Sequence, residues 1–470
     1  MSYTHLPELA ILIPSSNLGI LMCAPATPRI LDEFHSDSQL QSTILVSIWE
    51  LGEVVGPLVV GPLSEIYGRL PVYHIANILF VLFSVAAAES RNMDMLIAFR
   101  FLLGFTVAST TLNSSIVGDM FRPEHRGRAL TVMGMTPFIA PVLGPTVGGF
   151  LSEAKGWRWT FWFTAIVTGA FEIGFLAAYR ESYSVAILRR KTRRLQKQTG
   201  NKRLRSRYDT GVSGTALLAQ SLLRPLQLLF TSPAVLLVSI CGAFAISYTY
   251  VIITSITTIF EDNYGFSAGP IGLTYLGLGV LSLVHFHPAS CGTDVLPTAG
   301  FGMISSVVLC GAFLDWYLKR KMRQATTDPS PARPEHRLPP MVLGNVLVPL
   351  GLIGFGWTAE RHVHWMVPIF CTAVVGFGFV AVSLASWSYL IDAFGIYAAS
   401  ATAATTVLRN VAAAALPLAG PALYARLGLG RGNTVLGAVA LAFAPVPVLL
   451  MVMGERLRGK GWVKGLGQPV

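Results

Sequence analysis

Long apolar runs separated by short polar segments dominate the pattern of this chain of 470 residues. Runs of about 20 apolar residues are long enough to cross the hydrocarbon core of a bilayer as helices. Backbone polar groups in lipid must be satisfied within the segment, which leaves helices as the structure of these runs. The pattern predicts an all-α, polytopic membrane protein with twelve membrane-spanning helices, near residues 8–28, 42–63, 72–90, 95–117, 129–151, 158–178, 233–258, 269 onward, 340–358, 364–391, 396–424 and 433–453.

The polar segments divide the predicted helices into two groups of six. Residues 1–178 form an N-terminal bundle, 179–232 a basic linker, and 233–470 a C-terminal bundle. The linker holds twelve Lys and Arg residues against two acids. Because Lys and Arg collect on the cytoplasmic side, we expect the linker and both termini to be cytoplasmic. A basic linker could also hold anionic lipid, but we favour a solvated connector that sets topology.

Composition agrees with a membrane protein and excludes other classes. Hydrophobic residues make up 53% of the chain and charged residues 13%, about half the share of a soluble chain. The net charge of +11 is explained by basic cytoplasmic loops, so we expect no nucleic-acid partner. The five cysteines are scattered, and no catalytic motif or ATP-binding loop stands out, so we expect no enzyme, cofactor or metal site.

The stretch 61–73, GPLSEIYGRLPVY, is the most informative loop. It packs an acid, two glycines and an arginine between two apolar runs, which suggests a hinge with a charge relay. A similar spacing recurs from Gly311 to Asp315, followed by Lys319 and Arg320, at the equivalent place in the second half. We therefore expect a symmetric conformational switch, formed by Gly61, Glu65, Gly68, Arg69, Asp315 and Arg320.

Charged residues inside the apolar runs are candidates for proton coupling. Glu50 and Glu53 are three residues apart, on one helix face, so we expect one of them to hold a proton near neutral pH. Arg100 would cost about 2.5–3.5 kcal/mol in mid-membrane, so it should face a cavity and a partner, for which the two acids are the natural choice. The alternatives are an acid pair near the membrane surface and an arginine that snorkels to it. Glu172 is a second proton-binding candidate.

Several further motifs resemble the fungal drug:proton antiporters of the major facilitator superfamily, over about residues 24–458. These motifs lie at 61–69, 100–104, 144–149, 156–159, 180–183, 275–279 and 397–409. The resemblance implies two pseudo-symmetric six-helix bundles. It also implies proton-coupled efflux of a lipophilic small molecule, such as a secondary metabolite, mycotoxin or drug.

The resemblance also assigns roles to particular residues. It makes Arg100 part of proton coupling and the GPTVGG run of the fifth helix a hinge or seal, since small residues permit close helix approach. The hinge residues are Gly144, Pro145, Gly148 and Gly149. Side chains that could line a substrate cavity are Trp49, Tyr248, Tyr250, Trp387, Tyr389 and Arg409.

Residues 280–301 interrupt the eighth predicted helix and look like an atypical insertion, which must bulge from the helix or form an exposed loop. The group of His285, His287 and Cys291 lacks the further ligands of a metal site. Two other functions stay open. One is transport of polyamines, siderophores or another polar solute. The other is a non-transporting sensor, or a gene product disabled by the insertion.

The expected partners are a small-molecule substrate, protons and the lipid bilayer, and we expect a monomer. The expected location is the plasma membrane, with the vacuolar membrane as the alternative.

Overall fold

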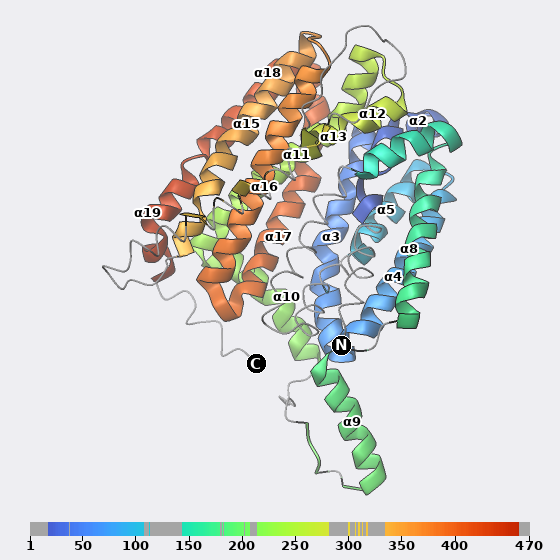
Figure 1. Ribbon diagram of the computed structural model, residues 1–470, viewed down its shortest axis with the longest axis vertical. Coiled ribbons are helices and arrows are strands. Elements are labelled where there is room, and N and C mark those ends of the chain that lie inside the picture. Colours follow the sequence, from blue (N-terminus) through green and yellow to red (C-terminus); the bar gives the residue numbers. More distant parts are fainter. Residues whose placement is uncertain are drawn as a thin grey trace.

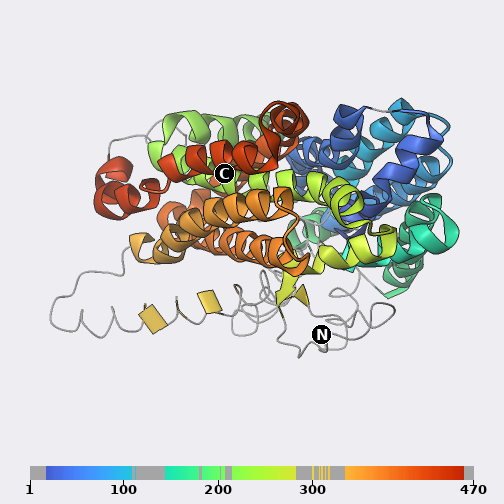
Figure 2. The ribbon, with the colours of Figure 1, turned by 90° about the horizontal axis from the view of Figure 1, so that it is seen from above.

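The computed structural model describes residues 17–36, 38–107, 112, 143–178, 181, 183–201, 203–206, 214–281, 299–300, 306, 309–310, 313, 316–317 and 334–459. The helices form two groups that lie side by side, as the two ribbon views show (Figures 1 and 2). The N-terminal helices, blue to teal, form one group, and the C-terminal helices, green to red, form the other. The domain limits 1–178 and 233–470 stay predictions.

The N-terminal group begins with a short helix over 17–21, which gives way to a turn before Pro25. The side chain of Ser38 then caps α3, because its Oγ accepts the N–H of Gln41 at 3.3 Å. The labelled helices here are η2 (Ala24–Ala26), α2 (Thr27–Glu33), α3 (Gln39–Tyr67), α4 (Arg69–Ala88), α5 (Met93–Val107) and α8 (Arg158–Ala178), and residues 143–155 are also helical.

The linker contributes two helices, α9 (Ser184–Thr199) and α10 (Gly214–Thr231). Figure 1 shows α9 extending away from the lower end of the N-terminal group. The distribution of Lys and Arg makes this lower end the expected cytoplasmic side.

The C-terminal group follows the predicted pattern, with a break in its last helices. Gly428, at φ 79°, interrupts α18, so that the residues before and after it belong to successive helices. The elements of this group are α11 (Pro233–Tyr264), α12 (Ala268–Thr274), α13 (Leu276–Gly279), η5 (Pro334–Arg337), α15 (Pro339–Glu360), α16 (Met366–Phe394), η6 (Gly395–Tyr397), α17 (Ala398–Ala415), η7 (Leu416–Leu418), α18 (Ala419–Ala442) and α19 (Val446–Gly459).

In the part of the chain that the structure describes, seven helical stretches are long and apolar enough to span a membrane. One of them, Ala398–Leu457, contains the break at Gly428 and so covers two successive helices. The predicted all-α membrane fold is confirmed.

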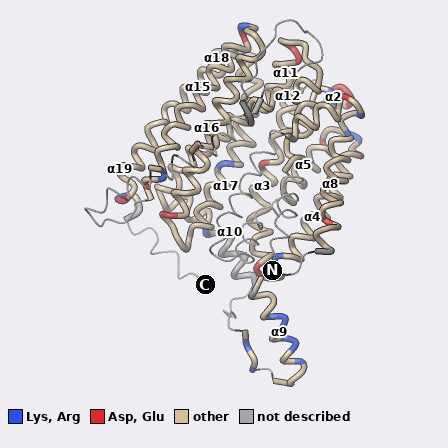
Figure 3. The backbone as a smooth tube through the Cα atoms, viewed as in Figure 1, with Lys and Arg blue, Asp and Glu red and all other residues tan. Residues whose placement is uncertain are grey.

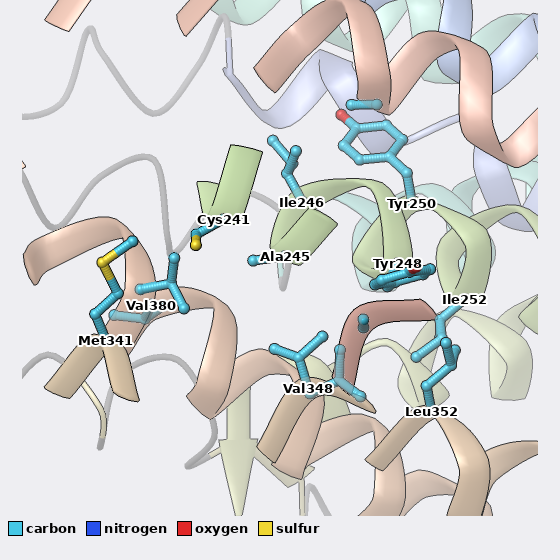
Figure 4. Close-up of a cluster of buried hydrophobic side chains, with 14 of the residues drawn as sticks. Cys241, Ala245, Ile246, Tyr248, Tyr250, Ile252, Met341, Val348, Leu352 and Val380 are labelled. Carbon is cyan, nitrogen blue, oxygen red and sulfur yellow. The ribbon is translucent and has the colours of Figure 1, made fainter. Parts of the chain in front are cut away.

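Among the candidate spans in the described part of the chain, α11 is buried over the largest share of its length, and it lies at the centre of the C-terminal group. Its side chains Tyr248 and Ile252 pack with Val348 and Leu352 of α15 in a continuous apolar cluster (Figure 4). Glycines bring α15 and α16 close together, since a Cβ built at Gly344 would lie 2.5 Å from the carbonyl of Gly378. Close helix contact thus fixes the scaffold around α11.

The atypical insertion leaves and re-enters the fold at one place. Helix α13 ends at Gly279, and β1 (Val280–Leu281) pairs with β2 (Ala299–Gly300) in a two-residue antiparallel ladder. Residues 282–298, including His285, His287 and Cys291, lie outside the described residues. The ladder brings the ends of this segment together, as a bulge from the eighth predicted helix requires.

Replacing residues 282–298 by Asn-Gly should preserve the fold, because Leu281 and Ala299 are partners in the ladder. Two residues are enough to connect antiparallel partners in a tight turn, whereas a direct bond between the partners could not reverse the chain. We expect unchanged yield and thermal stability of the purified protein in detergent. Loss of the folded protein on this replacement, with the wild type intact, would show that the segment is required.

Candidate functional site

A buried carboxylate of the N-terminal group contacts the C-terminal group in the middle of the structure. Helix α3 packs against α11 and α17. On α3, the buried Glu50 accepts a hydrogen bond at Oε1 from the hydroxyl of Tyr250 on α11. The contact therefore crosses the boundary between the two groups of helices.

Glu53 extends this contact toward α17. Its Oε1 accepts the indole N–H of Trp49 at 2.9 Å, and the side chain of Asn410 lies close to the carboxylate. Arg409 lies close enough for its charge to act on both carboxylates, and its Nε donates to Asn410 Oδ1 at 3.1 Å. We call Glu50, Glu53, Tyr250, Arg409 and Asn410 the central cluster. The sequence predicted four of these residues as site candidates, but it missed Asn410, beside Arg409.

Arg100 has other partners than the predicted ones. Its guanidinium donates to the carbonyls of Leu45, Gly19 and Ile20 at 3.1, 2.9 and 2.6 Å, and it lies 4.8 Å from the ring of Trp49. The expected pairing with Glu50 or Glu53 is wrong. Snorkelling is wrong too, because the side chain is 0% exposed.

The reason for these partners lies in the end of the first helix. Gly19 and Ile20 belong to the last turn of a helix that stops at Leu21, before Pro25. Carbonyls of a last turn have no partner within their own helix. Arg100 satisfies them, so its charge stabilises a helix end instead of a carboxylate.

Glu172, the other predicted proton-binding residue, lies apart from the central cluster, between α4 and α8. Its carboxylate pairs with Nδ1 of His74 and accepts the amide of Asn77 at 2.7 Å. The sequence pattern did not indicate His74 and Asn77 as partners of Glu172. Their spacing of three residues on one helix face was the available signal.

The predicted switch loop is shorter than expected, because α3 continues to Tyr67 and only Gly68 separates it from α4. Gly68 has φ +108°, a conformation that favours glycine. Gly61, expected in the switch loop, lies inside α3, where a Cβ would meet nothing within 4 Å. Glu65 lies within reach of the Arg69 charge.

A carboxylate from beyond α8 completes this loop. Glu181 accepts the backbone N–H of Arg69 at 3.2 Å and that of Tyr183 at 3.1 Å. A Cβ added at Gly68 would lie 2.4 Å from Oε2 of Glu181. The guanidinium of Arg69 donates to Ser64 Oγ at 2.9 Å and lies over the Tyr183 ring. The sequence pattern did not indicate Glu181 as a site residue, and the expected second half of the switch, Asp315 and Arg320, lies outside the described residues.

The predicted hinge glycines lie in very close helix contacts. A Cβ at Gly144 would lie 2.7 Å from the carbonyl of Leu18, and one at Gly148 would lie 2.0 Å from that of Met22. These two glycines therefore fit the helix of residues 143–155 against the first helix.

The same helix contacts the C-terminal group through Gly149. A Cβ there would lie 2.4 Å from the carbonyl of Ala268, and one at Gly272 of α12 would lie 2.5 Å from that of Pro145. Glu153 Oε2 accepts the N–H of Gly269 at 2.8 Å. These contacts close the boundary between the groups at the end opposite the linker (Figure 1).

Beside this closure, Glu33 at the end of α2 accepts the indole N–H of Trp157 at 2.6 Å and a hydrogen bond from Arg158. Burial alone would raise the pKa of Glu33. The two hydrogen bonds and the Arg158 charge outweigh burial and lower that pKa below its usual value. Glu33 therefore stays ionised at neutral pH and joins α2 to α8.

Two small cavities lined by described residues separate the candidates for a substrate cavity. Trp49 lines a small cavity inside the N-terminal group with Phe80 and Phe161. Tyr248 lines another inside the C-terminal group with Phe244. The others lie elsewhere: Tyr250 and Arg409 in the central cluster, Tyr389 fully buried in α16 and Trp387 partly buried there.

Comparison with known proteins agrees with this fold. The family model of the Major Facilitator Superfamily matches residues 9–417. The efflux pump radE of Floropilus chiversii is 40% identical over 442 residues, covering 94% of this chain and 78% of that protein. The MFS-type transporter penM of Penicillium rubens is 42% identical over 452 residues, covering 96% and 84%.

Solved structures show the same fold at low sequence identity. The inward-open, partially occluded xylose transporter XylE from E. coli aligns with a TM-score of 0.64 at 15% identity, covering 96% of this chain and 97% of that one. A POT family transporter aligns with a TM-score of 0.67 at 12% identity, covering 97% and 96%.

The chain belongs to the major facilitator superfamily. The predicted family and fold class are therefore confirmed, and the protein is a multi-pass membrane transporter and not an enzyme.

Replacing Gly149 by Ala should force the helix of residues 143–155 away from α12, because the new methyl would meet the Ala268 carbonyl. Overpacking of this kind costs about 1–3 kcal/mol. We expect a lower melting temperature in detergent and reduced transport. Gly174→Ala is the matched control, since its Cβ would meet nothing within 4 Å. Equal melting temperatures for the two variants would contradict this close contact.

Replacing Glu172 by Ala should destabilise the N-terminal group, because His74 and Asn77 would lose their shared acceptor. A buried polar group that loses its partner costs about 1–3 kcal/mol. Thermal unfolding in detergent would measure the effect, and Glu172→Gln, which keeps one acceptor oxygen, should lose less. An alanine variant as stable as the wild type would show that neither hydrogen bond contributes.

Proposed function

We propose that this protein is a proton-coupled exporter of a lipophilic small molecule. The observation that carries the proposal is the central cluster. It places two carboxylates of α3 against Tyr250 of α11 and the Arg409 charge of α17, at the boundary between the two groups of helices.

The central cluster links protonation to the contact between the groups. A buried carboxylate is stable only if it is paired or protonated. Ionised Glu50 and Glu53 attract Arg409 and so favour close contact of α3 with α17. Protonation removes this attraction and makes separation of the two groups less costly. Rocking of two bundles about a central site is how such folds alternate access.

Export is supported by the radE efflux pump, which is 40% identical to this chain. The proposed cargo is lipophilic, such as a secondary metabolite, toxin or drug, because the aromatic side chains of Trp49 and Tyr250 lie at the central cluster. A polyamine would need more carboxylates than the two of the central cluster.

The remaining roles follow from the same mechanism. The glycines of residues 144–149 act as the outer hinge. The loop from Gly61 to Arg69 acts as the cytoplasmic switch, with Asp315 and Arg320 as its second half. Arg100 holds the end of the first helix near the central cluster, and Glu172 stays a separate candidate for a proton. We propose a monomer in the plasma membrane, with the vacuolar membrane as the alternative.

Transport of the lipophilic dye rhodamine 6G by reconstituted protein tests the proposal. An imposed pH gradient should drive dye movement by the wild type, and spermidine should not compete. Glu50→Gln and Glu53→Gln mimic protonated carboxylates, so dye should still bind while the response to the gradient falls to background.

Glu89→Gln is the matched control, because Glu89 is an exposed acid that follows α4, outside the central cluster. Dye movement by the wild type that ignores the gradient would refute antiport. Gradient-driven movement that survives in both glutamine variants would remove the central cluster from the mechanism.

A further inference from the structure

The linker helix α9 carries a strongly basic exposed surface that the transport mechanism does not use. Helix α9 contains no acidic residue, and its charges lie along its length (Figure 3). Its partly buried side includes Val185, Leu188 and Thr192. The exposed basic residues are Arg189, Arg190, Lys191, Arg193, Arg194 and Lys197.

The first turns of α9 are fixed to the switch loop. Arg189 donates to the carbonyl of Ile66, in the last turn of α3, at 2.8 Å. Ala186 is buried beside Gly68, and a Cβ added at Gly68 would lie 3.4 Å from the methyl group of Ala186. Glu181, three residues before α9, accepts the first N–H of α4. A force on α9 therefore acts directly on the loop.

The position of α9 brings its first basic residues near the membrane. Helix α8, an apolar span, ends at Ala178, and α9 begins at Ser184. The cytoplasmic leaflet of a cell membrane is negatively charged, and it attracts basic clusters that directly follow a span. This charge complementarity favours anionic lipid headgroups as the occupant of the basic surface.

The attraction should decrease along α9, because the helix extends away from the bundle (Figure 1). Lys197 is seven residues beyond Arg190, which is about 10 Å along a helix. Salt screens charges over about 8 Å at physiological ionic strength. Arg189, the first basic residue of α9, is bonded to Ile66, so the next two, Arg190 and Lys191, should dominate the interaction.

We propose that the first half of α9 is not the solvated connector that the sequence favoured, and that it binds anionic phospholipid headgroups of the cytoplasmic leaflet through Arg190 and Lys191. Bound lipid holds α9 in place and, through Arg189 and Glu181, stabilises the conformation in which the switch loop bonds to the linker. Binding can be measured without transport, so this inference stands or falls separately from the proposed export function.

Native mass spectrometry of the full-length protein in detergent tests the binding. The protein is titrated with phosphatidylserine and, in parallel, with phosphatidylcholine of the same chains. We expect the wild type to retain phosphatidylserine about tenfold more strongly. The Arg190→Gln/Lys191→Gln variant should lose this preference, and the Arg194→Gln/Lys197→Gln variant, with the same change in charge, should keep most of it.

Three results would overturn the proposal. The first is equal retention of the two lipids by the wild type. The second is an equal loss of preference in the two double variants, which would remove the site from the first half of α9. The third is displacement of phosphatidylserine by soluble glycerophosphoserine, which would identify a site for free anions and not for the leaflet. Melting temperatures of both variants confirm that each is folded.

Discussion

The cost of a charged or polar group in the hydrocarbon interior is the constraint on which this structure depends. Three buried ionisable residues in the described part of the chain meet this cost in different ways. Arg100 bonds to carbonyls that the end of the first helix leaves without partners. Glu172 of α8 bonds to His74 and Asn77 of α4, within the N-terminal group. Glu50 differs from both, because its partner Tyr250 belongs to the other group of helices. Only this last arrangement must change when the groups separate.

Close helix packing determines which charges meet. A Cβ at Gly52 would lie 2.3 Å from the carbonyl of Phe101, and one at Gly104 would lie 2.2 Å from that of Trp49. The two glycines thus bring α3 and α5 into backbone contact, which places Arg100 under the ring of Trp49. The indole of Trp49 in turn donates to Glu53. The position of Glu53 in the central cluster therefore depends on close helix packing at Gly52 and Gly104, two residues without side chains.

The local hydrophobic pattern predicted the helices well, because the length of each apolar run must match the thickness of a bilayer. It placed α3 and α11 within a few residues of their observed starts. It failed where a distant segment supplies the partner. The pattern of residues 61–73 predicts a long polar loop, but α4 begins directly after Gly68. Glu181, more than a hundred residues later, accepts the first N–H of α4 and so stabilises this start. Likewise, nothing near Arg100 in the sequence indicates that the end of the first helix will satisfy it.

Helix α3 connects the central cluster with the switch loop, since it carries Glu50 and Glu53 at its middle and ends beside Gly68. Pro57 and Pro62 lie between these two regions. Each proline removes a backbone hydrogen bond, so α3 can bend there at lower cost than elsewhere. If separation of Glu50 from Tyr250 tilts the first part of α3, the last turn need not follow, because Arg189 bonds it to the linker helix α9. Bending at Pro57 and Pro62 then allows the first part of α3 to tilt while its last turn stays in place. The strength of the contact with the linker decides how far the whole helix moves.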